Sequence, residues 1–172
     1  MQKIKVQDLG VIKYAAALAI QTKKFEELIE TKMNERSNSD AHFLYLCEDQ
    51  PVITLGKAGN QQNILLSEEF LQEKGIDVFH INRGGDVTFH GPGQLTGYPI
   101  LDLEFFSSDL KVYMRMLEEV MILTIANYGI EGYRIADATG VWVNSKKDNQ
   151  PKKIAAFGVK TSRWITMHGF AL

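Results

Sequence analysis

The sequence predicts an α+β fold in which a mixed β-sheet is flanked by helices. Two long segments carry apolar residues at helical spacing, several short segments have the apolar and aromatic composition of strands, and no internal repeat divides the chain. A chain of 172 residues, 45% of them hydrophobic, can bury one core. We therefore expect a single domain over residues 1–172.

Three segments are predicted helices. Between Tyr14 and Met33, apolar residues recur every three or four positions with lysines and glutamates between them, which is typical of an amphipathic helix. The capping sequence SEEF, which starts at Ser67, predicts a short helix to Lys74. A third helix is expected from about Leu110 to Tyr128, with residues around it that cap or stop helices: Ser107, Ser108, Asp109 and Gly129.

The predicted strands are short apolar or aromatic segments between turn-forming residues. Two polar segments are predicted to be connections: a turn at residues 34–40 and a hairpin loop at residues 144–151. The expected strands lie at residues 42–47, 51–56, 76–82, 87–90, 95–103, 132–135, 140–144, 153–160 and 163–172.

Charge and composition exclude several classes of function. The net charge of -2 provides no general positive field, so nucleic-acid binding is not expected. No apolar stretch approaches the roughly 18 residues that a membrane span requires, and the first residues do not resemble a secretory signal. The one cysteine, Cys47, excludes an internal disulfide framework. We expect a cytoplasmic protein that does not contact membranes.

The most informative segment is the glycine-rich run RGGDVTFHGPGQLTGYPILDL, which starts at Arg83. Two glycines after Arg83 allow backbone to approach a ligand closely, and the GPG sequence after His90 forces a second tight turn. This pattern favours a binding site at a sheet edge. The alternative is that the glycines only form turns and that His90 is structural. Neither a dinucleotide-binding motif nor a P-loop is present.

This run resembles the signature of the octanoyltransferases of lipoate biosynthesis, the LipB or lipoyl(octanoyl) transferase family. The later run KKIAAFGVKTSRWITMHGFAL, which starts at Lys152, is similar to the second motif of the same family. The resemblance implies the fold of the catalytic domains of lipoate-protein ligases and biotin protein ligases.

The resemblance also implies a reaction, which is transfer of an octanoyl group from octanoyl-acyl-carrier-protein through a cysteine acyl-enzyme. The acceptor is a lysine of lipoyl domains in 2-oxoacid dehydrogenase complexes or of the glycine cleavage H protein. No cofactor and no metal are implied. Lys153 matches the family's catalytic lysine, which lowers the pKa of the cysteine. The implied substrate-binding residues are Arg83, Gly84, Gly85, Asp86, Val87, Thr88, Phe89, His90, Ala156, Phe157, Gly158, Gly169, Phe170 and Ala171.

Members of the family carry the cysteine in a Pro-Cys-Gly turn, which this chain lacks up to Leu172, and we expect truncation at the C-terminus. Cys47 is a poor substitute for that cysteine and is expected to be buried and inert, and His168 is interpreted as structural. We expect an apolar acyl slot that faces Lys153. Two alternatives remain: an ATP-dependent lipoate or biotin ligase, and a non-catalytic module that binds acyl groups or lipoyl domains.

Overall fold

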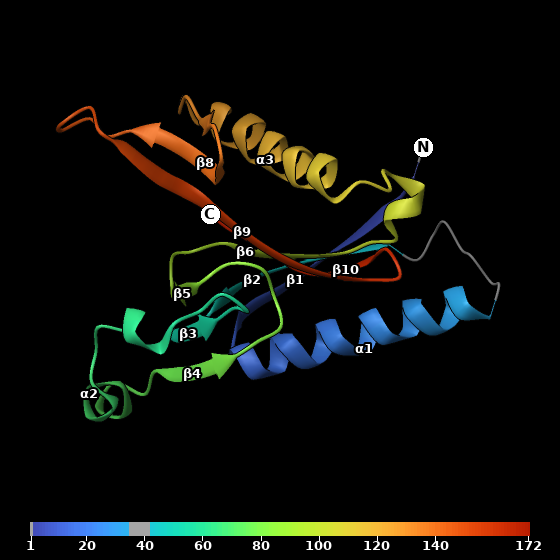
Figure 1. The fold of residues 1–172 in the computed structure, drawn as a ribbon, viewed down its shortest axis with the longest axis horizontal. Coiled ribbons are helices and arrows are strands. Elements are labelled where there is room, and N and C mark those ends of the chain that lie inside the picture. The colour runs from blue at the N-terminus through green and yellow to red at the C-terminus, as the bar shows by residue number, and fades with distance from the viewer. Residues whose placement is uncertain (1, 35–41) are drawn as a thin grey trace.

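The computed structural model describes residues 2–34 and 42–172, which form two β-sheets with helices packed on them (Figure 1). The predicted α+β class is confirmed, although the second sheet was not foreseen. The larger sheet has the strand order β1 (Ile4–Ile12), β2 (His42–Asp49), β6 (Thr96–Ile100), β10 (Ile165–Ala171), β9 (Pro151–Ser162), β8 (Ala138–Asn144), β7 (Tyr133–Ile135). The smaller sheet has the order β4 (Asp77–His80), β3 (Val52–Leu55), β5 (Val87–His90).

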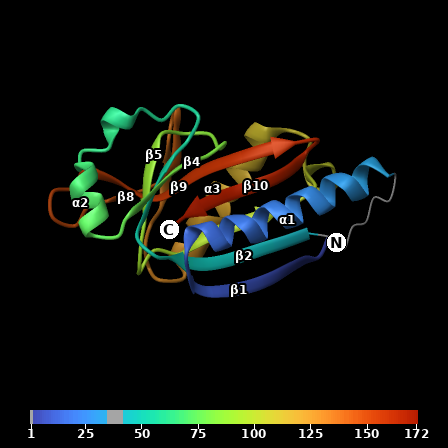
Figure 2. The same cartoon turned by 90° about the horizontal axis from the view of Figure 1, so that it is seen from below.

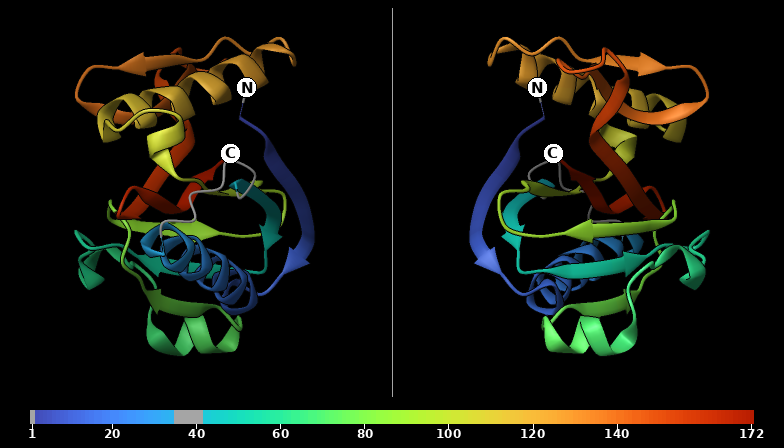
Figure 3. Two further views of the ribbon diagram at one scale, coloured as in Figure 1. Left: turned by 90° about the vertical axis from the view of Figure 1, so that its right-hand side faces the viewer. Right: turned by 90° about the vertical axis from the view of Figure 1, so that its left-hand side faces the viewer.

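Helices α1 (Tyr14–Met33) and α3 (Leu110–Ala126) cover opposite faces of the larger sheet (Figures 1 and 3). Phe25 and Leu28 of α1 pack in one buried cluster with Met167 of β10. On the other face, Met121 of α3 packs in a second cluster with Phe170 of the same strand. The smaller sheet and α2 (Glu68–Glu73) lie together beside the N-terminal end of α1 (Figure 2).

Local signals set the helix boundaries as predicted. Helix α1 buries a stripe at steps of three and four: Tyr14, Ala17, Gln21, Phe25 and Leu28. Helix α3 begins where the carboxylate of Asp109 accepts the backbone N–H groups of Lys111 and Val112, at 2.7 and 3.2 Å. After α3, Gly129 has a φ of +71°, which suits a helix stop.

Strand β1 was not predicted. It pairs in parallel with β2, but its side chains are mostly exposed on both faces, so no alternation of apolar and polar residues marks it. Strand β6 is shorter than expected because residues 103–105 form a turn of 3₁₀-helix. The turn predicted at residues 34–40 lies almost entirely outside the described residues.

Strands β9 and β10 form a hairpin with a two-residue turn. Ser162 pairs with Ile165, so Arg163 and Trp164 form the turn, with φ values of +50° and +66°. Two positive φ angles in a two-residue loop are characteristic of a type I′ turn, which suits the twist of the flanking strands. This hairpin carries both later segments of the predicted site.

An apolar groove of about 400 Å³ runs between α3 and the larger sheet. Its lining is almost entirely aliphatic and aromatic and includes Leu95, Val120 and Leu172. Within residues 2–34 and 42–172, no helix is long and apolar enough to cross a membrane.

Candidate functional site

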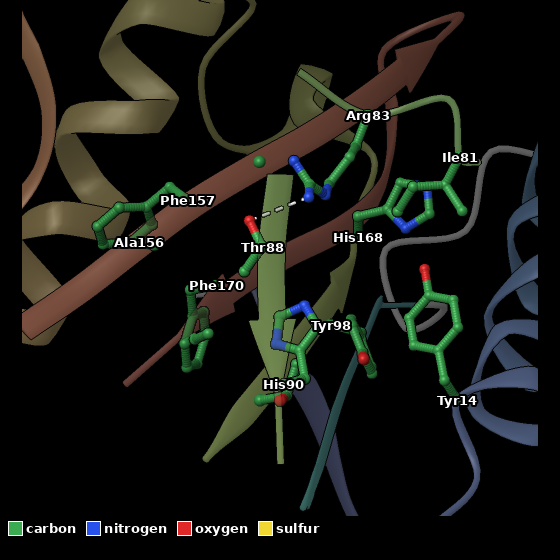
Figure 4. Close-up of a pocket in the computed structure, with 14 residues that line it drawn as sticks. Tyr14, Ile81, Arg83, Thr88, His90, Tyr98, Ala156, Phe157, His168 and Phe170 are labelled. Atoms are coloured by element: carbon green, nitrogen blue, oxygen red, sulfur yellow. Dashed lines mark hydrogen bonds between the residues drawn. The ribbon is translucent and has the colours of Figure 1, made fainter. Parts of the chain in front are cut away.

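A small cavity lies where the start of α1 meets β5, β6, β9 and β10 (Figure 4). Its volume is about 40 Å³, space for about three water molecules. Nine of the predicted substrate-binding residues line it: Arg83, Thr88, His90, Ala156, Phe157, Gly158, Gly169, Phe170 and Ala171. The structure therefore brings three segments that are far apart in the sequence to one point.

Arg83 is a buried cation at the wall of this cavity. Its guanidinium group donates to the Thr54 carbonyl at 3.0 Å and to the Thr54 hydroxyl at 2.8 Å. It donates to the Thr88 hydroxyl at 3.0 Å as well (Figure 4). It also donates to the Gly84 carbonyl at 3.0 Å. Burial lowers the pKa of Arg83 from its ordinary value. These partners are all neutral, so the positive charge remains available to a polar group in the cavity.

Glycine permits the close approach of the Arg83 loop to β9. A Cβ atom on Gly158 would lie 2.7 Å from the Gly84 carbonyl oxygen and 2.9 Å from Cδ of Arg83. The backbone N–H of Gly84 donates to the Val159 carbonyl at 3.0 Å. Because any side chain at position 158 would push the loop away, this glycine sets the position of Arg83.

His90 lies on the other side of the cavity. Its Nδ1 is 2.7 Å from Oε1 of Gln94, and its ring is stacked on Tyr14 with centroids 6.4 Å apart. Burial lowers the pKa of His90, and Arg83 adds to this effect, whereas Gln94 and Asp49 oppose it. The imidazole is therefore held neutral in a fixed orientation.

Tyr98 forms part of the cavity wall, and a hydrogen bond to Asp49 holds its side chain in place. Its hydroxyl donates to Oδ2 of Asp49 at 3.0 Å, and the carboxylate is completely buried. Burial and the nearby carboxylate raise the pKa of Tyr98 far above its ordinary value, so the phenol remains protonated. Cys47 is also buried behind this wall, and burial raises its pKa to about 12. The expectation of an inert Cys47 agrees with this environment.

Five predicted residues do not line the cavity. Gly84 and Gly85 contribute backbone to the loop, and Val87 packs in the core of the smaller sheet. The Asp86 carboxylate accepts the side-chain amide of Asn63 at 2.6 Å. Phe89 points outward and is 51% exposed. These residues shape the loop rather than the cavity wall.

Lys153 lies on β9 but is not among the cavity-lining residues of the described chain. Its exposed amine donates to the Thr139 carbonyl at 2.9 Å and sits 4.9 Å from the centroid of the Trp142 ring. The structure therefore does not place the Lys153 amine on the wall of the small cavity next to Arg83.

Other cavity residues were missed by the sequence analysis: Tyr14, Ile81, Thr96, Tyr98 and His168. Thr96 and Tyr98 follow the HGPGQ sequence at a spacing of two, which places them on one face of a strand, so this signal was readable. Tyr14 comes from α1, and only the folded chain shows that this residue reaches the cavity.

The fold and the clustered motif residues define a catalytic domain of the lipoyl protein ligase type. The family model for the lipoyl protein ligase A/B catalytic domain matches residues 13–172, and the chain belongs to this family. Relatives at 47 to 48% identity are octanoyltransferases, from Parabacteroides distasonis over 172 residues and from Flavobacterium johnsoniae over 175 residues. The predicted enzyme class, an acyltransferase of the octanoyltransferase type, is confirmed.

The matches include nearly all of this chain but a smaller share of each relative. The match includes 100% of this chain and 77% of the Parabacteroides protein, and 99% of this chain and 75% of the Flavobacterium protein. A Porphyromonas gingivalis octanoyltransferase is 49% identical over 166 residues, which are 96% of this chain but 33% of that protein.

Solved structures show the same fold at low sequence identity. The structure of P. falciparum LipL1 in complex with lipoate has a TM-score of 0.70 at 15% identity and includes 99% of this chain and 48% of the other. Lipoate-protein ligase A bound with ATP has a TM-score of 0.63 at 14% identity, with 99% and 65% covered. The predicted ligase-like fold is confirmed.

Proposed function

We propose that this chain provides the acyl-binding and acceptor-activating part of an octanoyl transfer from octanoyl-acyl-carrier-protein to a lysine of lipoyl domains. One observation carries the proposal: three separated motif segments converge on one cavity in a chain that resembles octanoyltransferases along its whole length. The acceptors would be the lipoyl domains of 2-oxoacid dehydrogenase complexes and the glycine cleavage H protein.

The chemistry of the cavity suits a thioester. A guanidinium group and a neutral imidazole can both donate to a carbonyl oxygen and stabilise negative charge that develops on it, and a thioester already carries an activated acyl group. The eight-carbon tail gains about 0.8 kcal/mol per CH₂ group when it leaves water. Because the cavity measures about 40 Å³, binding of the tail requires it to widen.

Lys153 is assigned the role of proton acceptor and thiolate partner in this proposal. Its amine is exposed and its partners are a carbonyl oxygen and an aromatic ring. No carboxylate of residues 2–34 or 42–172 forms an ion pair with it, so a change of rotamer frees it for the reaction. The acyl-enzyme step needs a reactive thiol, and Cys47 does not provide one because it is buried and protonated.

The test measures octanoyl transfer to a lipoyl domain by mass spectrometry with octanoyl-acyl-carrier-protein as donor. One arm uses the 172-residue chain. A second arm uses a chimera that also carries the part of the Parabacteroides relative outside the matched region. We expect transfer by the chimera without ATP. If the Parabacteroides relative transfers octanoyl groups and the chimera does not, the proposal is wrong.

Two further arms separate the alternatives. Octanoate with ATP, assayed for pyrophosphate release, tests for a ligase, and robust release would replace the proposed thioester reaction. Binding of octanoyl-acyl-carrier-protein without transfer in either arm would favour the non-catalytic module.

A further inference from the structure

His168 has a backbone conformation that is unusual for its residue type. It lies within β10 with a φ of +61°, in the left-handed region that side chains other than glycine rarely adopt. Such conformations cost roughly 1–3 kcal/mol and persist where the surroundings impose them. The residue is only 4% exposed, and its ring lines the cavity beside Arg83 (Figure 4).

Gln21 of α1 holds this backbone in place. Its Oε1 accepts the main-chain N–H of His168 at 3.2 Å, and the Gln21 side chain is completely buried. A glutamine in the middle of the apolar stripe of α1 costs desolvation energy that an apolar residue would not. The hydrogen bond to a strained residue across 147 positions of sequence explains its presence.

The ring nitrogens of His168 are the next feature of this site. Among the residues that the structure describes, neither ring nitrogen has a hydrogen-bond partner. The hydroxyl of Thr96 on the same cavity wall is likewise buried without a partner in this part of the chain. Buried polar groups are nearly always paired, so a ligand group in the cavity that bonds to these atoms would satisfy them.

The charge and protonation of the cavity residues indicate which polar group of a ligand would fit. Burial lowers the pKa of His168 to about 4, and the cations Arg83 and Lys160 add to the effect, so the imidazole is neutral near pH 7. A base with such a low pKa takes up a proton poorly. A neutral imidazole still offers one N–H donor, and a neutral donor next to a guanidinium group matches a carbonyl oxygen.

We propose that His168 donates a hydrogen bond to the carbonyl oxygen of the acyl group in the cavity, and that Gln21 is the positioning residue that directs the imidazole there. The proposal rests on the proposed function, because it takes the ligand to be an acyl group. Negative charge develops on that oxygen when the carbonyl carbon is attacked, so the same hydrogen bond strengthens during the reaction.

Two variants keep the backbone conformation. His168→Gly suits a positive φ and removes the ring, and His168→Asn also tolerates this region and retains an amide donor. The probe is octanamide, which carries the carbonyl on an eight-carbon chain, and 1-octanethiol is the probe without a carbonyl. The matched control variant is His80→Asn, the same change at an exposed position on β4.

Dissociation constants are measured by titration of the 172-residue chain. We expect His168→Gly to weaken octanamide binding about tenfold, the effect of one hydrogen bond, and His168→Asn to restore most of it. Octanethiol binding should change less than twofold in every variant, and His80→Asn should match the wild type. Equal octanamide affinity in His168→Gly and wild type would overturn the proposal, as would a wild type that does not bind octanamide.

A double-variant cycle tests the role of Gln21. Gln21→Leu should weaken octanamide binding in the wild type and have no further effect in the His168→Gly background, because the two residues act as one unit. Additive losses would reduce Gln21 to a structural residue and contradict its positioning role. Octanamide binding that persists when the chimera fails to transfer would leave this inference standing and overturn only the proposed function.

Discussion

The hydroxyl of Tyr98 donates to the completely buried carboxylate of Asp49 at 3.0 Å. The bond joins β6 to the end of β2 and fixes a phenol ring that faces the cavity on its other side. Oδ1 of Asp49 has no partner among the described residues, so this bond is a large part of what compensates the carboxylate for its burial.

Tyr98→Phe should therefore destabilise the protein by about 1–3 kcal/mol, because it leaves a buried acceptor with one donor fewer. The measurement is the urea concentration at the midpoint of unfolding, with the dependence of the free energy of unfolding on urea concentration unchanged. Tyr133→Phe is the matched control: its hydroxyl bonds to Asn144 at 2.6 Å at an exposed site, and its loss should matter little. Equal effects of both substitutions would contradict the importance assigned to the buried pair.

Gly158→Ala should displace the Arg83 loop, because its Cβ would lie 2.7 Å from the Gly84 carbonyl oxygen. We expect destabilisation by about 1–3 kcal/mol and weaker binding of octanamide. Gly84→Ala is the control for stability, since its Cβ would make an ordinary contact at 3.7 Å. A Gly158→Ala protein with wild-type stability and affinity would show that the loop does not depend on this contact.

Acid should destabilise the protein through His168. The folded-state pKa is about 4, below the value of 6.5 in the unfolded chain, so the unfolded state binds more protons between these values. The stabilisation is fully present above pH 6.5 and is lost as pH falls toward 4, with a total on the order of 3 kcal/mol. His90 shifts in the same direction. The free energy of unfolding, measured with urea between pH 4 and 7, should change less steeply with pH in His168→Asn than in the wild type. The same pH dependence in both proteins would exclude this contribution.

Cys47 should resist thiol reagents in the folded protein. Its pKa is raised to about 12 by burial and by Asp49, and the residue is only 2% exposed. Labelling with a disulfide reagent at pH 8 should be slow without denaturant and complete in urea. Fast labelling of the native chain, or an octanoyl adduct on Cys47, would contradict its assignment as an inert core residue.

Lys153→Ala in the transfer-competent chimera should remove most octanoyl transfer and leave the urea midpoint within about 0.5 kcal/mol of wild type, because the side chain is exposed. Lys152→Ala is the neighbouring control and should remain active. Lys153→Arg keeps the charge but cannot accept a proton, so it separates thiolate stabilisation from proton transfer. Full activity in Lys153→Ala would remove this residue from the mechanism.

The elements with a strong local signal were predictable. Helix α1 has the predicted bounds, because its periodicity covers five turns, and the predicted start of α3 follows from Asp109. Strand β1 was missed because it is held by pairing with β2 rather than by a buried face. Pairing partners that are distant in sequence leave no local pattern.

The candidate site was predictable only in part. The motif segments around Arg83, Gly158 and Gly169 converge as expected, but the distance between them depends on the paired strands. The position of Lys153 depends on an irregularity in pairing, since Val141 pairs with Ala155 whereas Trp142 pairs with Lys153. A bulge of this kind changes the direction of side chains and cannot be read from the residues themselves. The left-handed backbone of His168 likewise leaves no mark in the sequence and is visible only in the folded chain.

The turn between β9 and β10 places an arginine and a tryptophan where Asn-Gly is the preferred sequence. Both residues oppose the conformation they occupy, so the turn is a weak nucleus for the hairpin. Closure of the hairpin therefore depends on the pairing of its strands from Ser162 and Ile165 to Ala156 and Ala171, and not on the turn. The same pairing holds the two cavity segments side by side, so a substitution that weakens the strands would separate them even where the turn is unchanged.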